Sequence, residues 1–139
     1  MKKGKYIKDF DSWNLRKKEI QNNKDIESLF KVGEVWWCSI GINVGDEQDG
    51  KHNNFERPVF IYKKFNKNLF IGIPLTSNDK PSIFIYNFSY NSVDNMHKKL
   101  GQAILSQVRP FSSKRLLRKI GKVEYEEFGL IRKSLRLVI

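Results

Sequence analysis

The side chains best suited to chemistry lie at the ends of apolar stretches. Arg57 comes directly before the stretch Pro58–Lys64, and Thr76 comes directly after Leu69–Leu75. An arginine fork donates two parallel hydrogen bonds to phosphate oxygens and stays charged at any working pH. A hydroxyl at a strand end can donate to the same oxygens. The pair therefore indicates a phosphate-binding site; the alternatives are a surface arginine at a strand edge and a hydroxyl that caps a turn.

A second candidate pair follows farther along the chain. Gln107 and Arg109 are two residues apart in the stretch Gln102–Arg109, whose alternating pattern predicts a strand. Because alternate residues of a strand point to the same face, we expect these two side chains to lie together. Gln107 can bind a base edge or a phosphate, and Arg109 can hold a phosphate. The alternative for Arg109 is an ion pair at the edge of the fold.

The charge of the chain favours an anionic partner. The 139 residues include 26 Lys and Arg against 15 Asp and Glu, which gives a formal net charge of +11. A charge this far from zero favours binding to nucleic acid, an acidic protein or anionic lipid. A lysine-rich composition is also typical of AT-rich genomes, so the charge alone does not decide between partners.

The composition excludes several other classes of protein. The single cysteine, Cys38, rules out an intramolecular disulfide and a Cys-rich zinc site, and it fits a reducing cytosol. No apolar run approaches the ~20 residues needed to cross a bilayer, and no apolar segment follows the basic start of the chain. We therefore expect a cytoplasmic protein with no signal peptide and no membrane association.

The predicted helix and strands that position these side chains follow from a change in the hydrophobic pattern near Val32. Residues 1–30 are polar and charged, with apolar residues at loosely helical spacing. They predict a helix through about Gln21, capped by Asp11 or Ser12 and packed through Trp13. Beyond Val32 aromatic and β-branched stretches predict short strands. These strands are Val35–Ile40, Pro58–Lys64, Leu69–Leu75, Ile83–Phe88 and Gln102–Arg109.

The last thirty residues predict two helices. Ser112 and Ser113 are suitable caps for a short helix, Lys114–Ile120, which Gly121 would end. An apolar stripe with 3-4-3 spacing predicts a longer C-terminal helix; it consists of Phe128, Ile131, Leu135 and Val138. The fold class is therefore mainly β (α+β). We expect a small barrel with a C-terminal helix over residues 31–139, preceded by an N-terminal helical extension over residues 1–30.

Four short stretches, in this order, resemble one family. They are Gly33–Cys38, residues 45–51 with Arg57–Val59, Ile73–Ser77, and Leu105–Arg109 with Lys114–Leu116. One such motif alone is uninformative. Together, over about residues 31–125, they resemble the MazF/PemK toxins of bacterial type II toxin–antitoxin modules.

The resemblance implies an SH3-like small β-barrel of the MazF/CcdB toxin type that forms a homodimer. It also implies a metal-independent, sequence-selective endoribonuclease (an mRNA interferase), which cleaves single-stranded RNA by attack of a 2′-hydroxyl on its neighbouring phosphate. An acidic antitoxin would fill the RNA groove, and DNA would be contacted only through that antitoxin. Two other functions stay open: a non-enzymatic gyrase inhibitor of the same fold, and a catalytically degenerate RNA-binding module.

The family's motif positions assign the catalytic roles to Arg57 and Thr76 of this chain. Both side chains would then have to face one shared cleft. The residues that the resemblance assigns to substrate binding are Glu47, Gln48, Ser77, Gln107 and Arg109.

Two positions depart from the family pattern. Many relatives carry His where this chain has Asp46, and PemK-type members carry Asp where it has Phe111. An Arg–Asp acid–base pair is therefore missing. The groups left to move protons are Asp46, Glu47 or His52, which lie in a predicted loop over residues 41–56, a water, or the substrate itself. The alternative for these loop residues is a solvated surface.

The paired tryptophans Trp36 and Trp37 are neighbours in a predicted strand, so they must point to opposite faces. We expect one in the core and the other at a dimer interface. Stacking on RNA bases is the alternative.

Overall fold

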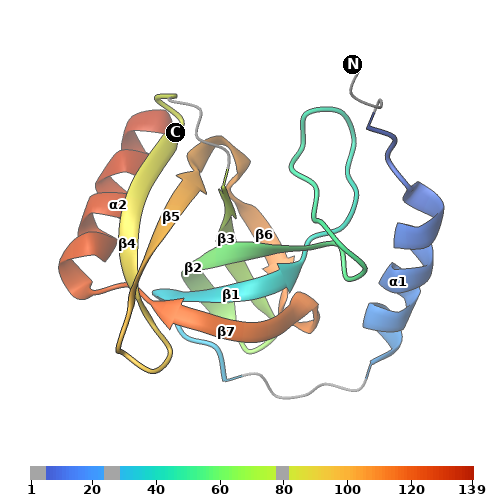
Figure 1. Cartoon of the computed structure of the whole chain (residues 1–139), viewed down its shortest axis with the longest axis horizontal. Helices are drawn as coiled ribbons and strands as arrows, with labels where there is room; N and C mark the ends of the chain where they lie inside the picture. The colour runs from blue at the N-terminus through green and yellow to red at the C-terminus, as the bar shows by residue number, and fades with distance from the viewer. Residues whose placement is uncertain (1–5, 24–28, 78–81) are drawn as a thin grey trace.

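The computed structural model describes residues 6–23, 29–77 and 82–139, and it shows a curved sheet with a helix on either side (Figure 1). The helices are α1, Phe10–Asn22, and α2, Tyr125–Val138. The strands are β1 Glu34–Ser39, β2 Glu56–Asn66, β3 Leu69–Thr76, β4 Ile85–Ser92, β5 Lys98–Ile104, β6 Arg109–Ser112 and β7 Leu116–Lys122. Two short 3₁₀ turns, η1 (Leu105–Gln107) and η2 (Ser113–Arg115), lie on either side of β6.

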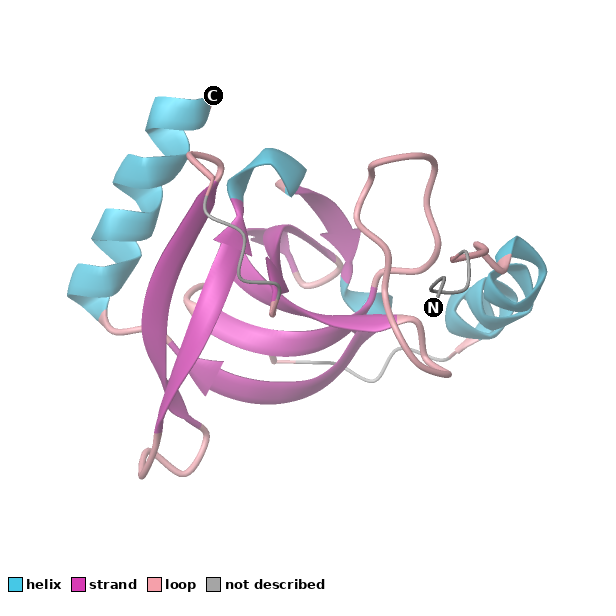
Figure 2. Ribbon diagram, turned by 45° about the horizontal axis from the view of Figure 1, so that its top comes forward, coloured by secondary structure: helices cyan, strands magenta, loops and turns pink. Residues whose placement is uncertain are grey.

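The strands pair antiparallel in the order β2-β1-β7-β4-β5-β3-β6. Strand β2 also pairs with β3, so the pairings lead from β2 through five other strands and back to it. Figure 2 shows the strands curving around a common interior, with α2 along the outer side of β4. The mainly β expectation with helices near both ends is confirmed.

Successive residues of β1 contribute to two separate apolar clusters. Val35 and Trp37 face the cluster that contains Phe60 of β2 and Ile131 of α2. Trp36 and Cys38 face the opposite cluster; its phenylalanines are Phe30, Phe70 and Phe111. The two tryptophans therefore point to opposite sides, as the strand period requires. The C-terminal apolar stripe is also confirmed, because Ile131 and Leu135 are buried against the sheet.

Helix α1 is attached to the sheet through Trp13, as expected. The indole is 6% exposed and packs edge-on against Phe55, with 5.6 Å between ring centroids. Gly41 makes room for it: a Cβ on Gly41 would lie 2.2 Å from the indole, and its φ of +86° also favours glycine. The expected caps, Asp11 or Ser12, were wrong by two or three residues. The N-cap is Asp9, whose carboxylate accepts a hydrogen bond from the Ser12 amide.

Two strand boundaries differ from the expectation. The fourth strand extends beyond Phe88 to Ser92, and after a short turn β5 begins at Lys98, before the expected Gln102. The predicted strand over 102–109 is interrupted, because β5 ends at Ile104 and the chain turns through η1 before β6 begins at Arg109. Gln107 and Arg109 therefore do not lie on one face of one strand.

The predicted helix Lys114–Ile120 was wrong. Its first residues form η2, and Leu116–Lys122 form β7, which pairs with β1 from Glu34 opposite Lys122 to Cys38 opposite Leu116. The local residues favour a helix, but pairing with β1 satisfies this backbone and overrides that preference. Gly121 does not end a helix; it allows β4 to approach β7 closely, because a Cβ there would lie 2.1 Å from the carbonyl oxygen of Asn91 in β4.

Candidate functional site

Arg57 and Thr76 are brought to one cavity by the β2–β3 hairpin. Val59 pairs with Pro74, and continuing this antiparallel register by two residues brings Arg57 level with Thr76. Both side chains line a cavity of about 420 Å³ at this end of the sheet. The volume lies within the ~300–1,000 Å³ typical of small-ligand sites.

The walls of this cavity combine aromatic, cationic and amide groups. Trp37 and Pro58 come from β1 and β2, and Gln102 of β5 lies directly opposite Thr76. Ser77, exposed, follows Thr76 at the rim. The other lining residues are Lys51, His52, Glu56, Leu75, Tyr90, Leu100 and Gly101. A flat aromatic surface beside hydrogen-bonding groups and cations is suited to a nucleotide.

The Arg57 guanidinium is more deeply placed than a surface arginine at a strand edge, which was the alternative for this residue. The residue is 7% exposed. Its Nε donates to the Asp49 carbonyl at 2.8 Å, and Nη1 donates to the Leu75 carbonyl at 3.2 Å. With the Gln48 amide oriented so that its oxygen faces the guanidinium, that oxygen accepts from Nη2 at 2.7 Å. These contacts use three of the five N–H groups and hold the plane of the fork fixed.

Positive charge is concentrated at Arg57. Burial lowers the pKa of the Arg57 guanidinium, and the neighbouring Asp49 carboxylate acts in the opposite direction; an arginine nevertheless keeps its proton. Within the described residues no carboxylate forms an ion pair with Arg57, because the Asp49 carboxylate is turned toward Lys8 and Tyr6. A buried cation bound mainly to neutral oxygens attracts an anion.

Gln107 connects η1 to the loop between β1 and β2. Its side-chain amide donates to the Asp46 carbonyl at 3.2 Å and accepts from the main-chain N–H of Gln48 at 3.1 Å. In the same loop the exposed Glu47 carboxylate accepts from the Val44 amide. The structure thus places Gln107 as a brace for the loop that carries Gln48, and not among the residues lining the cavity.

Arg109 lies elsewhere. It begins β6 opposite Gly72 of β3, and its guanidinium carbon is 4.5 Å from the centroid of the Phe111 ring. It is not among the described residues that line the cavities around Arg57. The structure therefore brings together Arg57, Thr76, Ser77 and, through the loop, Gln48, but not Arg109.

Several lining residues were not predicted from the sequence. Lys51 lies in the second motif and could have been included on that ground. Gln102 and Leu100 are placed by the pairing of β5 with β3 and β4, which a single sequence does not reveal. The sequence predicted that Trp37 points to the opposite face from Trp36. It did not predict the cavity beside Trp37, because residues of β2 and β5 form its other walls.

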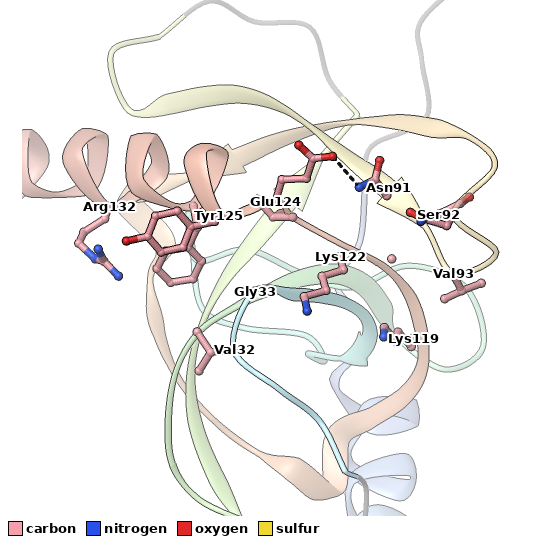
Figure 3. A pocket seen from close by; sticks show the side chains of 14 residues that line it. Val32, Gly33, Asn91, Ser92, Val93, Lys119, Lys122, Glu124, Tyr125 and Arg132 are labelled. Carbon is pink, nitrogen blue, oxygen red and sulfur yellow. Dashed lines mark hydrogen bonds between the residues drawn. The ribbon is translucent and has the colours of Figure 1, made fainter.

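A larger cavity, of about 820 Å³, lies at a different part of the molecule, between β7, the β4–β5 turn and the start of α2 (Figure 3). Lys119, Lys122 and Arg132 project around it, and the Asn91 amide donates to the Glu124 carboxylate at 3.2 Å. Lys119 is already paired with Glu34 at 2.7 Å. None of the predicted site residues lines this cavity.

Within residues 6–23, 29–77 and 82–139, no group of three or more His, Cys, Asp or Glu side chains is arranged to hold a metal ion. Neither of the two described helices is long and apolar enough to cross a membrane.

The fold is similar to that of solved MazF, MazE–MazF and endoribonuclease–antitoxin structures. MazF (Form-I) from Deinococcus radiodurans has a TM-score of 0.62 and 18% identity, covering 80% of this chain and 96% of that one. MazE–MazF (Form-II) from the same organism has a TM-score of 0.54 and 14% identity, covering 80% and 95%. An endoribonuclease in complex with its cognate antitoxin from Mycobacterial species has a TM-score of 0.52 and 14% identity, covering 76% and 90%.

At these identities the likeness to the solved structures establishes the fold. No curated protein sequence matches the chain closely enough to add to this comparison. Residues 31–139, well over half of the chain, match a family described as PemK-like, MazF-like toxin of type II toxin–antitoxin system. With the motifs in order and the same fold around them, the chain belongs to the PemK/MazF toxin family.

Proposed function

We propose that this protein is the toxin of a type II toxin–antitoxin module and acts as a metal-independent, sequence-selective endoribonuclease on single-stranded RNA. The observation that carries the proposal is the position of Arg57 and Thr76 across one cavity, with the guanidinium held rigid and two N–H groups still available. The circuit of strand pairings supports the SH3-like barrel of this family. Residues 31–139 are then the toxin domain, acting in the cytoplasm, and residues 1–30 an extension.

The proposed reaction needs a fixed positive charge more than a strong nucleophile. The 2′-oxygen forms a bond to phosphorus, the bond from phosphorus to the 5′-oxygen breaks, and the products carry a 2′,3′-cyclic phosphate and a 5′-hydroxyl. Negative charge grows on the non-bridging oxygens in the transition state. The remaining N–H groups of Arg57, one on each terminal nitrogen, donate to these oxygens, since a preorganised donor requires no rearrangement during the reaction.

Thr76 completes the phosphate contact from the opposite strand. Its hydroxyl lies at the end of β3, and we assign it as a donor to the same phosphate group. His52 lines the cavity beside Arg57 and is the imidazole we assign to proton transfer, in place of the family histidine that Asp46 replaces. Trp37 provides a stacking surface for a base at this site.

The partners follow from charge and from the similar structures. The net charge of +11 favours an acidic antitoxin as well as RNA. Two of the similar structures are complexes, one of MazE with MazF and one of an endoribonuclease with its cognate antitoxin. We propose an antitoxin that occupies the cavity at Arg57, and a homodimer as the active form, with DNA contacted only through the antitoxin.

The decisive experiment is incubation of the purified protein with mixed-sequence RNA in EDTA, followed by mapping of the RNA ends. Defined cuts with 2′,3′-cyclic phosphate ends support the proposal, and the flanking nucleotides give the recognition sequence. A gel shift without cutting would instead indicate a non-catalytic RNA-binding module. Intact RNA together with inhibition of DNA gyrase would indicate a non-enzymatic toxin.

Two pairs of variants test the assignments. Thr76→Val removes the hydroxyl and should slow cleavage strongly, whereas Thr76→Ser keeps the hydroxyl and should retain most activity. His52→Gln should lower the cleavage rate about 100-fold, whereas His97→Gln, in the β4–β5 turn, should leave it unchanged. Equal rates for the two histidine variants would show that another group transfers the proton.

A further inference from the structure

A second cavity adjoins the first on the other side of Arg57. It has a volume of about 660 Å³ and shares Arg57, Lys51 and His52 with the cavity at Thr76. Its remaining walls are the β1–β2 loop and the segment Tyr6–Asp9. The family match begins at residue 31, so this segment lies outside the part of the chain that the family describes.

The N-terminal segment is fastened to the loop by a set of polar contacts on one carboxylate. The Tyr6 hydroxyl donates to Asp49 Oδ2 at 3.1 Å, and the Lys8 ammonium lies 3.3 Å from the same oxygen. Lys8 also donates to the Gly45 carbonyl at 2.8 Å and to the Asn43 carbonyl. The Asp49 main-chain carbonyl in turn accepts from Arg57. Asp49 therefore connects the two parts: its carboxylate binds the N-terminal segment, and its main-chain carbonyl binds the Arg57 guanidinium.

The Tyr6 side chain is held at one end and open along the rest. Its hydroxyl is bonded to Asp49, yet the residue is 65% exposed and lines the cavity. An aromatic ring fixed by its hydroxyl loses little further freedom when a flat ligand stacks on it. A base can therefore bind there by stacking without a change in the protein.

The two adjoining cavities match the two nucleosides that each phosphodiester of RNA joins. Every phosphodiester carries one nucleoside on its 3′-oxygen side and another on its 5′-oxygen side. A phosphate held at Arg57, on the boundary between the cavities, therefore places one nucleoside in each. Both volumes fall within the range of small-ligand sites.

The charges of the second cavity are also compatible with a nucleotide. The cavity is lined by three carboxylates, and each has a hydrogen-bond donor: Asp49 accepts from Tyr6 and pairs with Lys8, Glu47 accepts from the Val44 amide, and Asp9 accepts from the Ser12 amide. Among the described residues, the Lys51 ammonium has no ion-pair partner and lines both cavities. An incoming phosphate thus meets Lys51 and Arg57.

We propose that the N-terminal segment builds a second nucleotide subsite beside Arg57, in which a base of single-stranded RNA stacks on the Tyr6 ring. This inference rests on the proposed function, because it takes the phosphate at Arg57 to be that of RNA. The segment Tyr6–Asp9 thus adds a wall to the site that residues 31–139, which match the family, do not supply.

The test measures binding of uncleavable oligonucleotides by fluorescence anisotropy. The oligonucleotide carries the mapped recognition sequence with deoxyribose at the cleavage position and is extended one nucleotide at a time from the scissile phosphate in either direction. If no cleavage is found, mixed-sequence RNA oligonucleotides of increasing length replace it. Tyr6→Ala should weaken binding about tenfold, but only for oligonucleotides long enough to occupy the second cavity. Tyr6→Trp should keep the affinity, and Tyr6→Phe should lose less than Tyr6→Ala.

Tyr125→Ala is the matched control, since Tyr125 is 92% exposed and lies at the other cavity. If the wild type cleaves RNA and the Tyr6 and Tyr125 alanine variants bind equally, the subsite is wrong and the proposed function stands. If RNA is bound in a Tyr6-dependent way but is never cut, the nuclease proposal is wrong and the subsite stands. Absence of binding by the wild type would overturn both.

Discussion

Arg57 has two roles that are separable in principle, because its guanidinium both stabilises the fold and faces the cavity. Replacing it with alanine removes the donors of the Asp49 and Leu75 carbonyls. We expect Arg57→Ala to lower the free energy of unfolding by about 1–3 kcal/mol. It should also slow RNA cleavage by at least about 100-fold. Urea unfolding and the cleavage rate measure the two effects independently.

Arg57→Lys distinguishes the planar fork from the charge. Lysine keeps the charge but cannot donate in two parallel directions. The variant should recover part of the stability while cleavage stays slow. If cleavage returned together with stability, a point charge would suffice and the fork would have no special role.

Cys38 gives a second prediction at the scale of one residue. Burial raises the pKa of its thiol to about 12, so the thiolate that reacts with disulfide reagents is almost absent at neutral pH. We expect no reaction of the native protein with Ellman's reagent and rapid reaction in urea. Rapid labelling of native protein would show that β1 opens easily at this position.

At the scale of elements, Glu34 joins β1 to β7 and to the turn before it. Its carboxylate accepts from the Lys31 amide at 2.7 Å and from the Trp36 indole at 3.1 Å, and pairs with Lys119 at 2.7 Å. Burial by itself would raise the pKa of this carboxyl, but the hydrogen bonds from Lys119, Trp36 and Lys31 outweigh it and lower the pKa.

A depressed folded-state pKa means that Glu34 stabilises the fold above its unfolded pKa of ~4.3, and that this contribution is lost as the pH falls through the folded value. Glu34→Gln should therefore destabilise the protein by about 2 kcal/mol at pH 7. The difference from the wild type should shrink in acid. Urea unfolding across the acid range tests this; a constant difference at every pH would show that the charge is unimportant.

Helix α1 is attached mainly through two buried side chains, Trp13 and Ile20, of which Trp13 is the larger. Trp13→Ala should lower the free energy of unfolding by about 3 kcal/mol, because the indole fills the space over Gly41 and against Phe55. Phe10→Ala, in the same helix but 48% exposed, is the control and should change it by less than about 0.5 kcal/mol. Equal effects would mean that α1 is not held by the indole.

How far the sequence predicted these elements depended on whether the deciding contacts were local. The stripe Ile131–Leu135 of α2 and the alternation of β1 were predictable, because each follows from the period of a single element. β7 was mistaken for a helix because its state is set by pairing with β1, more than 75 residues earlier in the chain. For the same reason Arg57 and Thr76 could be named from motifs, whereas Gln102 opposite Thr76 could not.

At the scale of the whole molecule, the excess of positive charge should govern how RNA binds. With a net charge of +11, affinity should fall steeply as salt is added, by a slope of ~0.7 in log units for each phosphate contacted on a single strand. Lys51 lines both cavities, so Lys51→Gln should reduce that slope by ~0.7, the value for one phosphate contact. Lys67→Gln, in the β2–β3 turn, should lower affinity slightly without a comparable change of slope.

The attachment of α1 has a consequence for motion. Among the described residues, every hydrogen bond between residues 6–23 and the rest of the chain involves a side chain, and no main-chain ladder crosses this boundary. Deuterium should therefore enter the α1 amides through local opening well before it reaches the interior strands. Openings that also break the contacts of Tyr6 and Lys8 with Asp49 would remove the second wall, so the fraction of time with the second subsite complete would depend on the stability of the N-terminal segment.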